Sequence, residues 1–275
     1  MGMQINTNIA ALNSYRNLSN TQNDLSKSLE KLSSGLRINR AADDAAGLAI
    51  SEGLKSQIGG VTVAARNAQD GISVVQTAEG SLTEVHSILQ RVRDLAVQAA
   101  NDSNNTDSRA AIQTEVTALT DELTRISAST NFNGINLLDG SANLTFQVGA
   151  GTGTNDQIAV DLSTLDVAGM VTTLGTKATD DAAGWNAWIA NVDTAITSIS
   201  TSRSELGAVQ NRFEHTINSL TVSKENLSAA NSRIRDTDMA SEMVNYTRAN
   251  ILSQAGTAML AQANQSNQGV LQLLR

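Results

Sequence analysis

The sequence predicts a mainly α protein, a long antiparallel helical bundle or coiled coil with a small β-hairpin region in its middle. Three observations point to this fold. The chain has no proline among its 275 residues, which permits long uninterrupted helices because proline costs about 3 kcal/mol in a helix interior. Hydrophobic residues make up 40% of the chain but aromatic residues only 3%, so aliphatic side chains must fill the core. Several segments also repeat apolar residues at alternating spacings of three and four, as coiled coils do.

The first helical pattern covers about residues 5–34 and ends at Ser33-Ser34-Gly35, a plausible stop signal. Its apolar residues recur every seven positions at Leu18, Leu25 and Leu32. The stretch 36–60 is rich in Ala, Gly and Asp, so we expect short helix mixed with turns there.

Two further helices are predicted at about 61–101 and 107–129, separated by the polar run 101–106. The first carries apolar positions at spacings of three and four: Val75, Ala78, Leu82, Val85, Leu89, Val92, Ala96 and Ala99. The second does the same at Ile112, Val116, Leu119, Leu123 and Ile126. Each stripe predicts a seam that packs against another helix.

The middle of the chain predicts a turn at 131–134 and then a β-hairpin. Apolar residues alternate with polar ones around 144–148 and 158–162, and the Gly/Thr-rich linker 149–157 would join the two strands. We expect residues 163–184 to be loop with some helix.

The last long helix follows a strict seven-residue register: Val192, Ile199, Leu206, Phe213, Leu220, Leu227 and Ile234. From residue 236 the pattern changes to Met, Leu and Tyr among many Ala, Asn and Gln residues. We therefore divide the chain into a terminal segment 1–44, a bundle core 45–235 with its hairpin at about 140–165, and a terminal segment 236–275. The stretches 1–35 and 236–275 look like partner-binding surfaces, because they have little within one chain to pack against.

Composition excludes several classes of function. The net charge of −8 repels nucleic acid and anionic membranes at long range, and no apolar run reaches the roughly 20 residues that span a bilayer. Cysteine is absent, so disulfides and thiolate metal sites are excluded. The first residues lack a basic segment followed by an apolar one, so no cleaved signal peptide is expected.

No catalytic, cofactor or metal site is expected. His86 and His215 lie on separate predicted helices and outside any H-E-x-x-H motif. The Gly-rich run 149–153 lacks the G-K-[ST] ending of a phosphate-binding loop, so we interpret it as the hairpin loop. The acid pairs Asp43-Asp44 and Asp180-Asp181 are interpreted as solvated or interface charges.

Long motifs along the chain resemble bacterial flagellins. They are Gln4 to Leu12, Leu32 to Asn39 followed by Ala42 to Gly47, Arg66 to Ser73, Leu89 to Gln98, Phe132 to Gly134, and Ile234 to Ala240. The resemblance implies a structural subunit that polymerises into the bacterial flagellar filament for swimming motility. It also implies a short form, mostly core with little or no variable outer domain.

The resemblance further implies that both termini pair as helices in an inner tube of the filament. The apolar positions expected to polymerise are Ile5, Ile9, Leu12, Leu18, Leu25, Met243, Tyr246, Leu252, Met259, Leu260 and Leu271. The alternative within the flagellum is a hook–filament junction protein. A secreted enzyme on flagellin ends would need a catalytic insert, for which 130–185 leaves no room, and the uncharged apolar face of the last helix argues against a cytosolic coiled-coil module.

Partners and location also follow from the resemblance. Besides further copies of the chain, the partners would be the flagellar cap and hook-associated proteins, and an export chaperone on the C-terminal helix. The protein would be extracellular, exported by the flagellar type III apparatus with the export information at roughly 26–47. The innate immune receptor Toll-like receptor 5 would contact four positions: Gln90, Arg91, Leu95 and Glu115.

Overall fold

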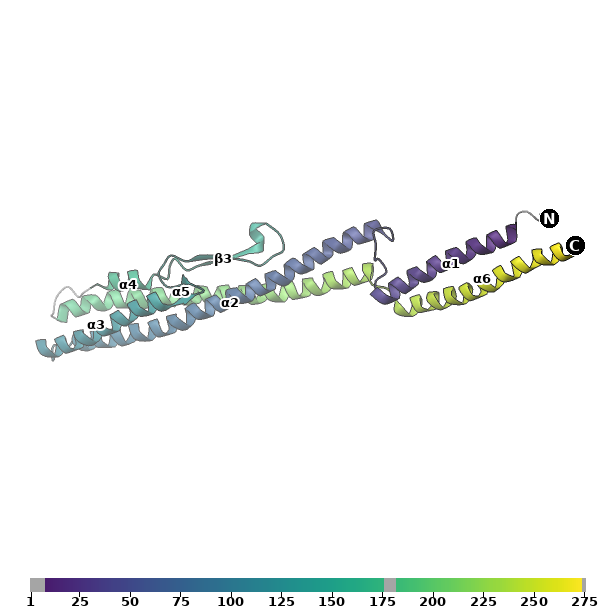
Figure 1. Ribbon diagram of the computed structural model, residues 1–275. Helices are drawn as coiled ribbons and strands as arrows, with labels where there is room; N and C mark the ends of the chain where they lie inside the picture. The colour runs from purple at the N-terminus through teal and green to yellow at the C-terminus, as the bar shows by residue number, and fades with distance from the viewer. Residues whose placement is uncertain (1–7, 176–181, 274–275) are drawn as a thin grey trace. The chain divides into compact units, whose positions relative to one another are not determined.

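The computed structural model describes residues 8–175 and 182–273, and the side chains of the last helix through residue 265. The described part of the chain is mainly helical with two small antiparallel sheets, which confirms the predicted fold class (Figure 1). The elements are α1 (Ile9–Ser34), α2 (Ala45–Ala99), α3 (Thr106–Ser129), β1 (Asn131–Phe132), β2 (Ile135–Asn136), β3 (Asn143–Gln147), a 3-10 turn (Thr154–Asp156), β4 (Gln157–Asp161), α4 (Val167–Leu174), α5 (Ala182–Arg235) and α6 (Met239–Leu273).

The chain forms two compact units. Unit 1 comprises 1–56 and 226–275, and unit 2 comprises 57–225. Helices α2 and α5 each contribute residues to both units.

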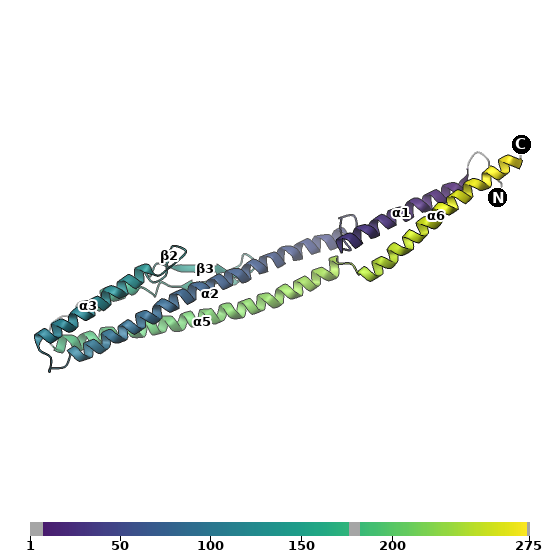
Figure 2. The same cartoon turned by 60° about the horizontal axis from the view of Figure 1, so that its bottom comes forward.

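Unit 2 is built on the antiparallel pair of α2 and α5, with α3 beside α2 (Figure 2). All eight α2 seam positions predicted from the sequence are fully buried, at 0% exposure: Val75, Ala78, Leu82, Val85, Leu89, Val92, Ala96 and Ala99. Two ion pairs flank the seam, Arg93 with Asp193 at 2.6 Å and Arg203 with Glu79 at 3.0 Å. The spacing in the sequence thus identified the core of this unit.

The seven-residue register of α5 is also confirmed, but its burial changes along the helix. The first four positions are buried, at no more than 3% exposure: Val192, Ile199, Leu206 and Phe213. The last three positions, Leu220, Leu227 and Ile234, are only half-buried. The densest packing therefore lies towards the N-terminal half of α5.

The predicted hairpin forms as β3 and β4, paired antiparallel from Asn143 with Asp161 to Gln147 with Gln157. Phe146 of β3 meets Phe213 of α5 edge to face, with ring centroids 5.5 Å apart. The side chain of Asn67 on α2 donates to the Gln147 carbonyl oxygen at 2.9 Å. The hairpin is therefore fixed to both long helices.

The turn expected at 131–134 is the tip of a second, smaller hairpin formed by β1 and β2. Asn133 and Gly134 at its tip have φ angles of 51° and 81°. Asn-Gly is the preferred pair for a two-residue hairpin turn, because both residues tolerate positive φ. The sequence showed the turn, and the structure adds the short strands on either side of it.

The described part of 163–184 contains α4, and residues 176–181 of that stretch lie outside the described residues. Asp166 begins α4 by accepting a hydrogen bond from the backbone amide of Gly169. The indole N–H of Trp188 donates to the Leu174 carbonyl oxygen at 2.7 Å, which holds the end of α4 against α5. The expectation that 163–184 would be loop with some helix is therefore confirmed for the described part of this stretch.

One expectation was wrong: 45–60 is not a mixture of short helix and turns but the first part of α2. The glycines of this stretch suggested turns. A Cβ at Gly60 would lie 2.8 Å from the Cβ of Ala150, so this glycine gives the hairpin loop room to approach the helix. Close packing, not a turn, explains its presence.

Unit 1 is built on α1 and α6, which run antiparallel (Figures 1 and 2). Asn8 caps α1 and also donates from its side chain to the Ala263 carbonyl oxygen at 2.9 Å. Gly35, at a φ of 73°, ends α1 in the left-handed conformation, as the predicted stop at Ser33-Ser34-Gly35 requires.

Candidate assembly surface

The seam between α1 and α6 combines small and polar residues with four leucines and a tyrosine, all five of which are only half-buried. On α1 the half-buried or buried positions recur at spacings of three and four: Ala11, Ser14, Leu18, Thr21, Leu25, Ser28 and Leu32. On α6 they do so at Glu242, Tyr246, Ala249, Ser253, Gly256 and Leu260. Burying small polar side chains contributes little hydrophobic free energy. The contact between α1 and α6 therefore contributes less hydrophobic free energy than the fully buried seam of unit 2 does.

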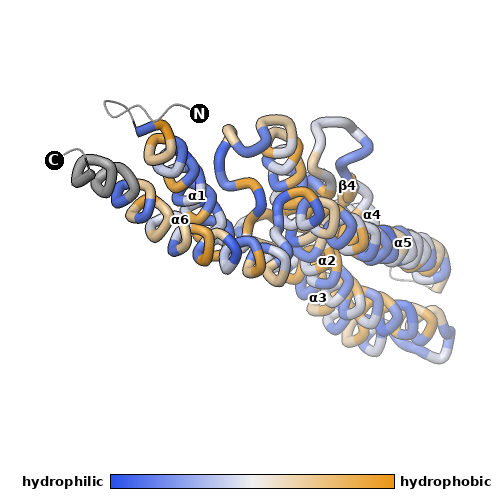
Figure 3. Tube along the Cα trace, turned by 90° about the vertical axis from the view of Figure 1, so that its right-hand side faces the viewer, coloured by the Kyte–Doolittle hydropathy of each residue, from blue (hydrophilic) through white to orange (hydrophobic). Residues whose placement is uncertain are grey.

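Further large apolar residues lie exposed on the outer faces of the two helices. On α1 they are Ile9, Leu12, Tyr15 and Leu29, each 55–63% exposed. On α6 they are Met239, Met243, Val244, Ile251, Leu252 and Met259, each 47–63% exposed. We call these ten residues the assembly surface, and Figure 3 shows hydrophobic positions recurring along both helices. Large apolar side chains exposed in this number on one helix pair indicate an interaction site.

Part of the assembly surface is hollowed. A shallow trough of about 450 Å³ on α6 is lined by Met243, Val244, Thr247, Arg248, Ile251 and Leu252. Four of these six side chains are apolar, so the trough fits an apolar side chain of a partner.

The structure divides the predicted polymerisation residues into three groups. Ile9, Leu12, Met243, Leu252 and Met259 lie on the assembly surface, whereas four are half-buried where α1 and α6 meet: Leu18, Leu25, Tyr246 and Leu260. Ile5 and the side chain of Leu271 lie outside the described residues.

Sequence reasoning did not nominate five exposed apolar residues: Tyr15, Leu29, Met239, Val244 and Ile251. They lie outside the single apolar stripe that the sequence analysis followed along each helix. The sequence nevertheless indicated them, because each helix has more large apolar residues than one helix–helix seam can bury.

A short backbone clasp joins the ends of α1 and α5. The amide of Arg37 donates to the Arg235 carbonyl oxygen at 2.6 Å, and the amide of Thr237 donates to the Gly35 carbonyl oxygen at 3.0 Å. The Arg235 guanidinium also pairs with Glu52 at 2.7 Å. The clasp brings the beginning of α6 beside the end of α1 and so sets the register of their seam.

Asp43 stabilises the loop that leads from the clasp to α2. Its carboxylate accepts hydrogen bonds from the backbone amides of Arg40 and Asn39, at 3.0 and 3.2 Å. These bonds, that of Arg40 foremost, hold the pKa of Asp43 below its usual value. The loop therefore keeps its shape best when this carboxyl is ionised.

The four receptor candidates do not form one surface. Arg91 donates to Glu115 from two nitrogens, at 2.7 and 3.0 Å, and joins α2 to α3. Gln90 is exposed, and its side-chain nitrogen lies 2.9 Å from Nε2 of His86. Leu95 is 2% exposed and packs in the core of unit 2. Three of the four side chains are thus accessible in the subunit.

Neither a metal centre nor a membrane span stands out in the described part of the chain. Among the described residues no three His, Cys, Asp or Glu side chains gather closely enough to hold a metal ion. None of the described helices combines the length and hydropathy that crossing a membrane demands.

Family comparison agrees with this architecture of paired terminal helices. The chain matches the bacterial flagellin N-terminal helical region over residues 5–143 and the bacterial flagellin C-terminal helical region over residues 189–274. The chain belongs to the bacterial flagellin family. The unmatched middle, 144–188, holds all but the first residue of the β3–β4 hairpin, α4 and the first residues of α5.

Relatives match along the whole length. The flagellin of Bacillus subtilis is 52% identical over 99% of this chain and 100% of its own, and that of Halalkalibacterium halodurans is 51% identical over the same shares. The 33 kDa flagellar filament core protein of Treponema phagedenis is 46% identical over 99% of this chain and 100% of its own. The alignment with Clostridium tyrobutyricum flagellin runs over 377 positions, so that relative carries residues that the 275 here lack. This flagellin is a short form.

A solved structure agrees as well. The crystal structure of Bacillus cereus flagellin superposes with a TM-score of 0.50 at 33% identity, over 60% of this chain and 94% of that one. The chain is a structural subunit of the bacterial flagellar filament, an extracellular appendage, and it polymerises with other flagellin subunits.

Proposed function

We propose that the assembly surface is where neighbouring copies bind in the filament. The observation that supports this is that ten large apolar residues of α1 and α6 stay exposed, while the leucines of the seam between the two helices are only half-buried. A helix pair of this kind buries its apolar surface only when other chains cover it.

The free energy of burying the assembly surface is large enough to offset the cost of association. Covering the exposed half of one Leu, Ile or Met side chain contributes on the order of 1 kcal/mol. Ten such residues, each covered by a neighbour, offset an association cost of about 4–15 kcal/mol. In the free subunit α1 and α6 are marginally stable, and incorporation at the filament tip orders them.

The three segments of the chain then have different roles. Segments 1–44 and 236–275 form the inner tube, and 45–235 forms the surrounding shell that carries the hairpin. The role of the chain is mechanical, and it performs no catalysis. Within the flagellum, the filament rather than the hook–filament junction is its place, because the relatives that match over their full length are flagellins and filament core proteins.

Before assembly the same surface needs protection. An export chaperone that covers α6 would prevent early polymerisation, since six of the ten assembly-surface residues lie on that helix. The flagellar cap and hook-associated proteins would meet the same helices at the two ends of the filament. Export through the flagellar type III apparatus completes the proposal.

Recognition by Toll-like receptor 5 is a further part of the proposal. Gln90, Arg91 and Glu115 provide an exposed polar surface, and the buried Leu95 holds α2 in place beneath it. Arg91→Ala should reduce activation in a receptor reporter assay at unchanged thermal stability, and unchanged potency would exclude the contact. Arg125→Ala on α3, which breaks the exposed Arg125–Glu122 pair, is the matched control.

Truncation tests the polymerisation surface. Removing 1–20 or 256–275 should leave unit 2 folded by circular dichroism but abolish filaments in electron micrographs after seeding. Filaments formed by either truncated chain would contradict the proposal. Growth by the full chain under the same conditions is the control.

A further inference from the structure

The tip of the β1–β2 hairpin is the Asn133-Gly134 step, the one place in the sequence where Gly follows Asn. A glycine after Asn or Asp leaves the backbone nitrogen unshielded, so that this nitrogen can attack the side-chain carbonyl carbon and close a succinimide ring. Two Asp-Gly steps share this property, Asp70-Gly71 and Asp139-Gly140. The structure distinguishes the three steps, because the reaction needs an accessible backbone nitrogen in a segment that can change its conformation.

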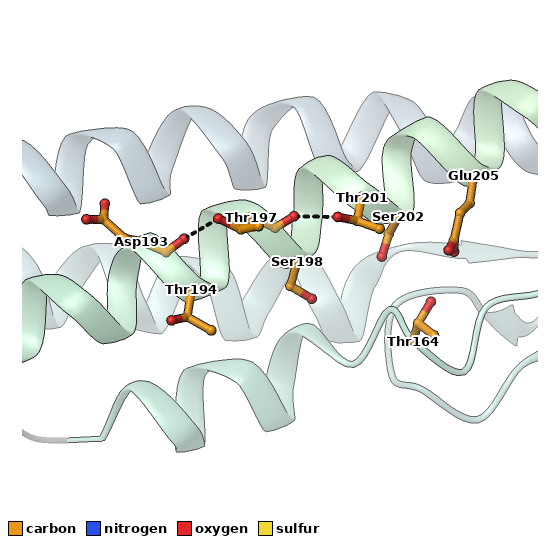
Figure 4. Close-up of a pocket in the computed structure, with 8 residues that line it drawn as sticks. All are labelled: Thr164, Asp193, Thr194, Thr197, Ser198, Thr201, Ser202 and Glu205. Atoms are coloured by element: carbon orange, nitrogen blue, oxygen red, sulfur yellow. Dashed lines mark hydrogen bonds between the residues drawn. The ribbon is translucent and has the colours of Figure 1, made fainter.

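The Asn133-Gly134 step is open to solvent. Both residues are exposed, and within the described parts of the chain neither the Asn133 carboxamide nor the Gly134 backbone amide has a hydrogen-bond partner. A Cβ at Gly134 would meet nothing within 4 Å, so no neighbouring atom blocks an approach. The exposed hydroxyl groups of α5 differ in this respect, since Thr197 and Thr201 donate to carbonyl oxygens one turn earlier, at 2.8 and 3.0 Å (Figure 4). The reacting groups of the hairpin tip are therefore available.

The hairpin tip can change its conformation at little cost. β1 and β2 contain two residues each, and an isolated two-stranded hairpin is marginally stable. Asn133 is also the one non-glycine residue with a positive φ in the part of the chain that the structure describes, and this conformation is disfavoured for L residues. Below the tip, the Leu137 amide donates to the Thr130 carbonyl oxygen at 3.1 Å, and the Leu137 side chain is fully buried. The tip can therefore open while the base of the hairpin stays fixed.

The Asp139-Gly140 step also lies in a loop, but its groups are held in place. The Asp139 carboxylate accepts hydrogen bonds from the Ser141 hydroxyl at 2.7 Å and from the Ser141 backbone amide at 3.0 Å. These bonds, that of the hydroxyl foremost, lower the pKa of Asp139, so its carboxyl stays ionised and resists attack by a nucleophile. A Cβ at Gly140 would lie 2.8 Å from the Cβ of Asp166, so the backbone of this step is closely packed.

The Asp70-Gly71 step lies inside α2. In an α-helix each amide nitrogen points at the carbonyl oxygen one turn earlier, so it cannot turn towards the side chain of the preceding residue. A Cβ at Gly71 would lie 2.6 Å from the Phe213 ring, which shows that the core also fixes this backbone. Of the three steps, the hairpin tip alone combines exposure, an accessible nitrogen and a conformation that can change.

We propose that the Asn133-Gly134 step is a site of spontaneous covalent modification, which converts Asn133 to aspartate and isoaspartate through a succinimide. The Gly134 nitrogen gives its proton to water and bonds to Cγ of Asn133, and the carboxamide nitrogen leaves as ammonia. Water then adds to one of the two ring carbonyl groups. Opening at Cγ restores the ordinary backbone with an aspartate side chain, whereas opening at the backbone carbonyl leaves the chain linked through Cγ, as isoaspartate. Solvent water is the co-reactant, and nothing is oxidised or reduced.

The modification changes the hairpin tip in two ways. Either product adds a carboxylate to a chain whose net charge is already −8. Isoaspartate also inserts one methylene group into the backbone, which a two-residue turn cannot accommodate while Phe132 stays paired with Ile135. Because Ile135 is 44% exposed, the change stays at the surface of unit 2 and leaves its core in place. Modified subunits thus record the time since their synthesis.

The test follows the full-length monomer during incubation at mildly alkaline pH, where base removes the amide proton, beside a sample unfolded in urea. Peptide mass spectrometry with electron-transfer fragmentation reports conversion and backbone linkage at each step. In the folded protein we expect aspartate and isoaspartate at position 133, and ordinary linkages at Asp70 and Asp139. An intact Asn133 in the folded monomer, over a period in which the unfolded chain converts, would overturn the proposal. Aspartate formed without isoaspartate would also overturn it, since direct hydrolysis gives that product alone.

Two variants separate the effect of the structure from that of the local sequence. Asp139→Asn gives the packed loop the same reacting groups as the hairpin tip. We expect position 139 of this variant to convert about tenfold more slowly than Asn133 in the folded protein, and at a similar rate in urea. Asn133→Gln lengthens the side chain by one methylene group, keeps it uncharged, and should abolish conversion at the tip. Equal rates at the two positions in folded Asp139→Asn would contradict the role assigned to the structure.

Discussion

Units 1 and 2 are both built on antiparallel helix pairs with the same alternating spacing, yet they differ in how completely they bury their large apolar residues. In unit 2 the seam holds Leu82, Leu89 and Val92, all at 0% exposure. In unit 1 the seam leucines Leu18 and Leu25 are only half-buried, and ten further large apolar side chains stay exposed. The spacing of apolar residues therefore predicts which helix faces pair. The large side chains that stay exposed show whether that helix pair is stable without other chains.

The largest expected loss of unfolding free energy follows from a substitution in the core of unit 2. Phe213→Ala removes a ring at 0% exposure that packs on Phe146, and should cost about 3–5 kcal/mol of unfolding free energy. Leu252→Ala, at 52% exposure on α6, should cost no more than about 0.5 kcal/mol in the monomer. Urea unfolding of both variants compares the two units directly. Equal destabilisation would show that unit 1 has a core of its own.

The next largest effect is expected on filament growth, from substitutions on the assembly surface. The double variant Leu252→Ser and Met259→Ser removes two large side chains from the assembly surface and should leave the monomer Tm unchanged. Its critical concentration for filament growth should rise about thirtyfold, which corresponds to about 2 kcal/mol. Asn245→Ser, an exposed polar position on the same helix, is the control and should polymerise normally. A double variant that polymerises like the parent would remove these residues from the interface.

A third effect distinguishes two glycines of α2 within unit 2. A Cβ at Gly71 would lie 2.6 Å from the ring of Phe213, so Gly71→Ala should destabilise by about 1–3 kcal/mol. A Cβ at Gly80 meets nothing within 4 Å, so Gly80→Ala should stabilise by about 0.5–1 kcal/mol through helix propensity alone. Thermal unfolding measures both, and the same sign for the two variants would contradict the packing described for Phe213.

The smallest effect concerns the loop of unit 1 at Asp43. A depressed carboxyl pKa contributes stability that is fully present above the pKa of the unfolded chain, near 4, and is lost as the pH falls through the lower folded-state pKa. The carboxyl carbon of Asp43 should therefore titrate at a lower pH than an ordinary aspartate does, as measured by NMR. Asp43→Asn should remove this part of the acid sensitivity of unit 1, whereas a normal titration midpoint would show that the two backbone hydrogen bonds do not form in solution.

The sequence predicted the core of unit 2 well, because the burial of each seam follows directly from spacing. The start of α2 was missed, because Gly60 suggested a turn and only the position of Ala150 shows why a glycine stands there. The β1 and β2 strands were missed because two residues are too short to show alternation.

The candidate surfaces were harder to predict. Leu18 and Leu25 formed a clear stripe, but a stripe does not tell whether its partner is in the same chain. The structure places them beside α6, where Leu18 touches Gly256.

Hydrogen–deuterium exchange of monomer and filament tests the central claim most directly. If neighbouring copies complete unit 1, the amides of α1 and α6 should exchange rapidly in the monomer and become strongly protected in the filament. The amides of 75–99 on α2 should be protected in both states. Equal protection of α1 and α6 before and after polymerisation would contradict the account.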